Sequence, residues 1–269
     1  MCGLSGILTT DPAERAALAE PCVSMRDTLT HRGPDDCGLW VDPIDGVALG
    51  FRRLSIVDLS REGHQPMESA SRRFVLVFNG EVYNSRELGA ELAAAGARFR
   101  GHSDTEVILA AFERWGIEAA VQRFIGMFVI AVWDRHTRTL SLIRDRLGIK
   151  PLYVYWEPGL LLFGSELKAL IAHPRFTARI NRVALASYLR YLYVPAPASI
   201  LHGVSKLLPG SILKVRDAST APPAPQRFWS AEVVAHNNAP DRGRVAEQEL
   251  VEQLHTLVAD AVSLRMRAA

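Results

Sequence analysis

A cysteine directly after the initiator methionine is the residue with the clearest potential for chemistry in this sequence. Removal of Met1 would make Cys2 the N-terminal residue, and the short side chains of Cys2 and Gly3 suit that removal. The free α-amine, with an unperturbed pKa of about 7.7–8.0, could then take the thiol proton directly or through a water molecule. We therefore treat Cys2 as a candidate nucleophile, although an isolated cysteine is more often an ordinary buried apolar residue.

A polar run over residues 31–36, His-Arg-Gly-Pro-Asp-Asp, places four titratable side chains in six positions. The Gly-Pro pair within it permits no regular element, so we expect a loop. Two interpretations remain open at this point: a solvated turn with internal ion pairs, or a loop beside a site.

An Asn-Gly pair, Asn79 and Gly80, follows five consecutive apolar residues, 74–78, which predict a strand buried on both faces. In isolation such a pair is usually a hairpin turn. A helix is expected to follow here, because Asn84 and Glu87 have the spacing of a capping pair. We therefore predict that Asn79 and Gly80 lie at a strand-to-helix corner that projects backbone N–H groups outward.

A similar capping signal opens the next helix. Ser103 and Glu106 are spaced as a capping box, and apolar residues continue the helical period to Trp115, before Gly116. Asp104 would lie in the first turn, where an acidic residue commonly complements the helix dipole, an interaction worth about 0.3–1 kcal/mol. A structural role is therefore the first interpretation of Asp104.

The remaining elements predict strands and helices in separate runs. Helical spacing covers residues 11–29, with an interruption at Pro21. Short apolar strands joined by tight polar turns favour antiparallel pairing, because parallel strands need long crossovers. The sequence therefore predicts an α+β fold with helices stacked on antiparallel sheets. Strands are expected over residues 47–51, 74–78, 127–133, 139–143, 152–155 and 160–163.

The character of the chain changes from about Pro195, where prolines become frequent. Residues 237–243 predict an exposed linker, and residues 245–266 predict one amphipathic helix. An apolar stripe at the very end of a chain indicates a helix that has lost, or awaits, the surface on which it packs. The stripe consists of Leu250, Leu254, Leu257, Val258, Ala261 and Leu264.

Composition excludes several classes of function. The 269 residues include 31 basic and 29 acidic side chains, without a Lys/Arg block of the kind that nucleic-acid or anionic-membrane binders use. The start has no signal-peptide pattern, and no apolar run is long enough to span a bilayer. The three cysteines form neither a paired framework nor a metal-binding pattern. We predict a cytoplasmic protein with no metal, no nucleic acid and no membrane partner.

Seven short motifs follow one another along the chain. They are Met-Cys-Gly at the start, His-Arg-Gly-Pro-Asp at 31–35, Arg-Arg-Leu-Ser-Ile-Val-Asp at 52–58, Asn-Gly-Glu-Val-Tyr-Asn at 79–84, Ser-Asp-Thr-Glu at 103–106, Arg-Asp-Arg-Leu-Gly-Ile-Lys-Pro-Leu-Tyr at 144–153 and Ser-Glu-Leu-Lys-Ala-Leu at 165–170. In this order and spacing they resemble the glutaminase half of glutamine-hydrolysing asparagine synthetases. The resemblance implies a class II glutamine amidotransferase with the N-terminal-nucleophile hydrolase fold, a four-layer αββα sandwich of two antiparallel sheets.

The same resemblance divides the chain into three parts. Residues 2–195 would form the glutaminase domain, residues 196–244 a Pro-rich connecting segment, and residues 245–269 the first helix of a truncated synthetase domain. The family's second half opens with a Ser-Gly-Gly-Leu-Asp-Ser loop that holds pyrophosphate, and this chain contains no such run. The chain ends about where that loop should begin.

The resemblance also assigns roles to particular residues. Cys2 would attack the side-chain amide carbon of glutamine and form a γ-glutamyl thioester that water hydrolyses. The Asn79 side-chain amide and the Gly80 N–H would form the oxyanion hole. Arg53 would bind the α-carboxylate and Asp104 the α-ammonium. Asp104 could also keep its structural role, because a carboxylate has acceptor sites for both. The other expected site residues are Glu81 and, through their backbone, Ile56 and Val57.

The expected cofactors and partners follow from the family. The glutaminase step needs no cofactor, whereas ATP and Mg are expected only for the missing synthetase half. The partners would be L-glutamine, that C-terminal half in cis or in trans, and a second copy of the chain in a homodimer. Two alternatives remain: an amidotransferase with an acceptor other than aspartate, and a non-catalytic binding module.

Overall fold

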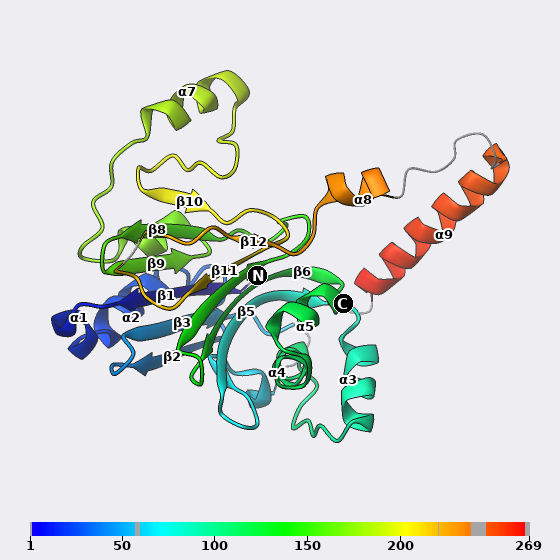
Figure 1. Ribbon diagram of the computed structural model, residues 1–269, viewed down its shortest axis with the longest axis horizontal. Helices are drawn as coiled ribbons and strands as arrows, with labels where there is room; N and C mark the ends of the chain where they lie inside the picture. Colours follow the sequence, from blue (N-terminus) through cyan, green and yellow to red (C-terminus); the bar gives the residue numbers. More distant parts are fainter. Residues whose placement is uncertain (1, 57–59, 220, 238–245, 267–269) are drawn as a thin grey trace.

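The computed structural model describes residues 2–56, 60–219, 221–237 and 246–266, which form two stacked antiparallel sheets with helices on both outer faces (Figure 1). In spatial order, the first sheet contains β10 (Val204–Lys206), β8 (Tyr153–Glu157), β9 (Leu160–Gly164), β1 (Gly3–Thr9), β3 (Val47–Arg53) and β2 (Asp36–Asp42). The second contains β12 (Gln226–Arg227), β11 (Ser211–Val215), β7 (Thr139–Arg144), β6 (Gly126–Asp134), β5 (Phe74–Val82) and β4 (Met67–Glu68).

The helices lie mainly between these strands in the sequence. They are α1 (Pro12–Ala16), α2 (Ala19–Asp27), the 3-10 turn η1 (Arg61–Gly63), α3 (Ser85–Ala94), α4 (Asp104–Trp115), α5 (Ile117–Arg123), α6 (Leu167–Ile171), α7 (Arg182–Tyr191), α8 (Ala231–Asn237) and α9 (Glu247–Met266).

Three apolar cores hold the layers together. Between the sheets, alternate residues of facing strands pack on one another, including Leu4 and Leu8 of β1 and Val75 and Val77 of β5. The outer face of the second sheet packs against α3, α4 and α5, and the outer face of the first packs against α2 and α6. The order helix, sheet, sheet, helix confirms the predicted αββα sandwich. The ladder pairs are antiparallel, as the tight turns predicted.

The predicted interruption at Pro21 is wrong. The break in the helical run comes earlier, between α1 and α2, and Pro21 lies in the first turn of α2. Proline is tolerated there because the first N–H groups of a helix have no intrahelical acceptor.

The predicted strand-to-helix corner at Asn79 and Gly80 is also wrong, because β5 continues through both residues to Val82. Asn79 pairs with Val129 of β6, and Gly80 pairs with Phe128. The long partner strand β6 offers pairing along the whole of β5, so tertiary pairing overrides the turn preference of an Asn-Gly pair. The two residues are therefore held in the sheet by β6 on one side, whereas β4 pairs with β5 only at Val75 and Leu76.

The two capping signals have different outcomes. Ser103 caps α4, as predicted, by accepting the N–H of Thr105 at 3.2 Å. Asn84 precedes α3 but makes no side-chain cap. Its Oδ1 instead accepts the N–H of Ile125 at 2.9 Å, so Asn84 ties the start of α3 to the segment before β6.

Residues beyond 195 add strands to both sheets. β10 pairs with β8, β11 pairs with β7, and β12 pairs with β11. Ile212 and Val215 of β11 are buried in the two cores that flank the second sheet. The division of the chain at residues 195 and 244 stays a prediction. Apart from Asn237, the last residue of α8, the predicted linker lies outside the described residues.

The predicted C-terminal helix is present as α9, which projects from the sandwich (Figure 1). None of its described residues is buried. Near its end, the Arg265 guanidinium lies 5.0 Å from the ring of Tyr83. Assignment of α9 to a synthetase domain stays a prediction. Within the described part of the chain, the helices are too short or too polar to cross a membrane.

Candidate active site

The candidate site lies at the head of β1, where Cys2 continues the alternation of Leu4 toward the core between the sheets. The Leu54 N–H donates to the Cys2 Sγ at 3.4 Å, and the thiol contacts the Leu54 carbonyl at 3.6 Å. Cys2 lines a cavity of about 140 Å³. Burial raises the pKa of the thiol, whereas the Leu54 hydrogen bond and the charges of Arg53 and Lys150 lower it.

The structure brings the predicted site residues together in this one cavity. Val57 lies outside the described residues, and every other predicted residue lines the cavity wall. Those residues are Cys2, Arg53, Ile56, Asn79, Gly80, Glu81 and Asp104.

The N–H of Gly80 faces the cavity because of its place in β5. Along an antiparallel strand, N–H groups of alternate residues point to the same side. On the side away from β6, the Phe78 N–H donates to the Gln65 Oε1 at 2.6 Å, and the Val82 N–H donates to the Asp104 Oδ2 at 3.0 Å. Gly80 lies between these two residues, so its N–H points the same way.

Two contacts explain why this position is open and why it is a glycine. Phe128, the ladder partner of Gly80, directs its N–H to the Asp145 Oδ2 at 3.2 Å and accepts the Asp145 N–H at 2.8 Å. The backbone N–H and carbonyl of Phe128 therefore point toward Asp145 and not toward Gly80. A Cβ at Gly80 would lie 2.2 Å from the Met127 carbonyl oxygen, which leaves no space for a side chain.

The side chain of Asn79 points from β5 toward the core between the sheets, on the same face as Val75 and Val77. It is 1% exposed, and among the described residues its Nδ2 has no hydrogen-bond partner. A buried donor without an acceptor costs about 1–3 kcal/mol. An Nδ2 donor and a Gly80 N–H that both lack an acceptor among the described residues form the kind of arrangement that stabilises an oxyanion.

Two opposite charges belong to the same cavity. Burial raises the pKa of the Asp104 carboxyl to about 7, although the hydrogen bond from the Val82 N–H lowers it. The Arg53 Nη1 donates to the Ser60 carbonyl at 2.8 Å. Its guanidinium lies so close to Gly63 that a Cβ there would be 2.1 Å from Nη2. One acid and one fixed guanidinium suit a small zwitterionic ligand.

Sequence reasoning missed the role of Arg32, which lies in the polar loop at 31–36. The Arg32 Nε donates to the Cys2 carbonyl at 2.9 Å, and its Nη1 pairs with Glu166 at 2.9 Å. Burial would raise the pKa of Glu166, but hydrogen bonds from Arg32, His31 and Lys168 lower it to about 2. The loop therefore lies beside Cys2, which favours the interpretation of a loop beside a site.

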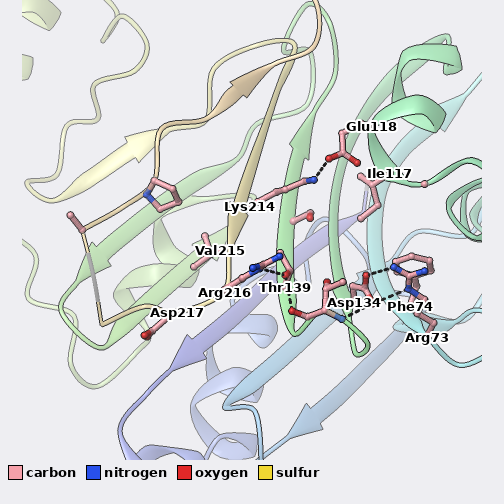
Figure 2. Close-up of a pocket in the computed structure, with 15 residues that line it drawn as sticks. Arg73, Phe74, Ile117, Glu118, Asp134, Thr139, Lys214, Val215, Arg216 and Asp217 are labelled. Atoms are coloured by element: carbon pink, nitrogen blue, oxygen red, sulfur yellow. Dashed lines mark hydrogen bonds and ion pairs between the residues drawn. The ribbon is translucent and has the colours of Figure 1, made fainter.

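A second hollow, of about 580 Å³, lies at the turn end of the β6–β7 hairpin (Figure 2), and Cys2 is not among its lining residues. Four of its charges form two ion pairs, since Arg73 contacts Asp134 at 2.7 Å and Lys214 contacts Glu118. Arg216 and Asp217 also line the hollow, but its described lining contains no cysteine or histidine that could act as a nucleophile or base. The cavity at Cys2 is therefore the candidate active site.

Comparison with known proteins agrees with this geometry. The family described as "Glutamine amidotransferase domain" matches residues 1–229. A putative glutamine-hydrolysing asparagine synthetase of Mycobacterium bovis is 36% identical over 100% of this chain and 42% of the relative. Asparagine synthetase 1 of Bacillus subtilis is 34% identical over 100% of this chain and 40% of the relative. The chain thus spans less than half the length of these two relatives.

Solved structures share the fold. Glutamine phosphoribosylpyrophosphate amidotransferase from B. subtilis superposes with a TM-score of 0.59 at 18% identity, over 84% of this chain and 49% of that one. The two stacked antiparallel sheets and their outer helices define a protein of the αββα sandwich class. Within that class, the chain belongs to the glutamine amidotransferase domain family.

Proposed function

We propose that this chain hydrolyses the side-chain amide of glutamine, with Cys2 as the N-terminal nucleophile once Met1 is removed. The observation that carries the proposal is the cavity lined by a thiol, by the Asn79 amide, whose Nδ2 has no acceptor among the described residues, and by the open N–H of Gly80. The first group can attack an amide carbon, and the other two can receive the charge that develops on its oxygen.

The reaction would proceed in two balanced steps. The α-amine of Cys2 takes the thiol proton, and the thiolate attacks the amide carbon to form a tetrahedral oxyanion at Asn79 and Gly80. The carbon–nitrogen bond then breaks, and ammonia leaves with a proton returned by the α-ammonium group. Water adds to the resulting thioester through a second oxyanion, and glutamate and the free thiol are released.

Substrate selection would rest on the opposite charges of the cavity. A guanidinium binds a carboxylate with two parallel hydrogen bonds, which suits Arg53 to the α-carboxylate of glutamine. Asp104 would hold the α-ammonium, with Glu81 as a second acidic neighbour. The backbone of Ile56 and Val57 would complete the contacts.

The acceptor of the ammonia is proposed from the relatives. Because the curated relatives are named asparagine synthetases, we propose that the ammonia serves ATP-dependent amidation of aspartate in a synthetase half, in cis or in trans. ATP and Mg would belong to that half, and the glutaminase step would need no cofactor. A homodimer and a cytoplasmic location are further parts of the proposal.

Glutamate release tests the proposed activity. Protein shown by intact mass to lack Met1 is incubated with glutamine in the absence of ATP, and glutamate and ammonia are measured. We expect equal amounts of both products, because each turnover cleaves one amide. Folded protein without Met1 that releases neither product would contradict the proposal.

Glutamine affinity is expected to weaken as the pH falls below about 7, the pKa to which burial raises the Asp104 carboxyl. Protonation removes the charge that faces the substrate ammonium, and this ammonium stays protonated at acidic pH. Calorimetry with Cys2→Ala protein measures binding without turnover. Asp104→Asn should bind weakly at pH 8 and respond little to pH. An affinity that stays constant between pH 5 and 8 would contradict the assignment.

A further inference from the structure

The motif at residues 144–153 has no part in the proposed chemistry, yet it builds an unusually well-fixed loop after β7. Asp145 at its start is fully buried and accepts backbone N–H groups from the loop and from β6. The donors are Phe128 at 3.2 Å, Leu147 at 3.1 Å, Ile149 at 2.9 Å and Lys150 at 3.0 Å. One carboxylate therefore fixes the path of the loop from its inner side.

Arg144 fixes the same loop through its carbonyl groups. Its guanidinium donates to the carbonyls of Gly148 at 2.7 Å, Lys150 at 2.8 Å and Leu207 at 2.5 Å. Gly148 has a φ of +66°, a conformation that glycine adopts without strain. The backbone of Lys150 is thus held at both of its polar groups: Asp145 accepts its N–H, and Arg144 donates to its carbonyl.

The loop places the side chain of Lys150 in the active-site cavity. Lys150 is 5% exposed and lines the cavity together with Cys2, Asn79 and Glu81. A charged ammonium is rarely buried without opposite charges close by. Among the described residues, the charged neighbours of Lys150 include Glu81, Asp145 and the thiolate form of Cys2, with Arg32 as a like charge.

We propose that Lys150 is a positioning residue for the nucleophile. Its ammonium group stabilises the Cys2 thiolate in a cavity whose burial otherwise disfavours a negative charge. The proposal rests on the glutaminase function for its purpose, but the thiolate itself can be measured without turnover. The interaction is reciprocal, since burial raises the pKa of the thiol and the charge of Lys150 lowers it. Burial lowers the pKa of Lys150, and the thiolate raises it.

Other charged groups around the cavity define the alternatives. Arg53 from β3 is a second cation that acts on Cys2. Glu81 from β5 has a pKa that burial raises and Lys150 lowers, so Lys150 could instead serve mainly to keep Glu81 ionised for the substrate ammonium. That role would change the KM for glutamine and leave the reactivity of the thiol unaltered. Thiol reactivity therefore separates the two roles. The α-amino group at the start of the chain also lowers the pKa of the thiol. Among the described residues, Asp104, Asp145 and Arg32 are further charged groups near Cys2 and Lys150.

The test is the pH profile of Cys2 alkylation by iodoacetamide, followed by intact mass in a Cys37→Ser background. Cys22 is fully buried with a pKa of about 12, so it does not compete. Lys150→Met keeps an unbranched side chain, one atom shorter, and removes the ammonium group, a change that buried ions often tolerate. We expect its alkylation at pH 7 to be about three- to tenfold slower, because a smaller fraction of the thiol is ionised. The rate should recover at high pH.

Three variants control the measurement. Lys150→Arg keeps the charge and should retain most of the reactivity at pH 7. Lys150→Gln should behave like Lys150→Met, and it provides the same measurement if the methionine variant does not fold. Lys214→Gln removes a lysine of the second hollow and should match wild type. A wild-type profile in the folded Lys150→Met or Lys150→Gln protein would overturn the proposal, even in a chain that proves to have no glutaminase activity.

Discussion

Replacement of Cys2 by alanine is expected to abolish glutamine hydrolysis, with a loss of about 10⁴-fold or more in kcat. The reason is that Cys2 is the one thiol among the described residues that line the cavity, and a hydroxyl is a much weaker nucleophile at its free pKa. Glutamine binding should survive, since Arg53 and Asp104 are unchanged. Glutamate release and calorimetric binding, measured on the same protein, check both parts.

Cys37→Ser is the matched control for this experiment. Cys37 lies in β2 and is exposed, so its replacement removes a thiol without touching the cavity. It should hydrolyse glutamine at the wild-type rate. Activity of Cys2→Ala within tenfold of wild type would show that the hydrolysis has another origin. Loss of glutamine binding in that variant would instead place Cys2 in the recognition of the substrate.

The layers of the fold could be predicted from local patterns. Runs such as 74–78 and 127–133 are apolar on both faces because each strand packs against a second sheet on one side and helices on the other. Tight polar turns then leave antiparallel pairing as the available solution. The edges of the fold were harder to predict. β10, β11 and β12 lie in a Pro-rich stretch, and their burial depends on sheet edges formed far away in the sequence.

Seven of the predicted site residues line one cavity, but the predicted geometry of Asn79 and Gly80 was wrong. An Asn-Gly pair has a local turn preference, and the sequence does not reveal that β6 pairs with β5 through both residues. The actual arrangement is more rigid than a corner, because flanking N–H groups of β5 are already bonded to Gln65 and Asp104. Lys150 was missed for a similar reason. Its approach to Cys2 spans 148 positions of sequence, and a single lysine in a loop is usually solvated.

The Asn79 Nδ2, which has no hydrogen-bond acceptor among the described residues, leads to the second prediction. Asn79→Ala is expected to lower kcat for glutamine hydrolysis by about 10²–10³-fold with little change in KM, because an oxyanion donor acts in the transition state more than on the bound substrate. The melting temperature should not fall as much as it does when most other buried polar residues are replaced by alanine. The Nδ2 has no hydrogen-bond partner among the described residues, so its removal leaves no acceptor unsatisfied and removes a buried donor.

Asn181→Ala provides the opposite pattern as a control. Asn181 caps α7 by accepting the N–H groups of Val183 and Ala184, and its loss should destabilise the fold by about 1 kcal/mol without changing kcat. Asn79→Asp tests the charge, since a carboxylate at the oxyanion position should be at least as damaging as alanine. Steady-state kinetics and thermal unfolding of the three variants distinguish the two roles. If Asn79→Ala loses stability and retains kcat, the side chain of Asn79 is a structural group of the inter-sheet core, and the oxyanion would have to rely on the N–H of Gly80.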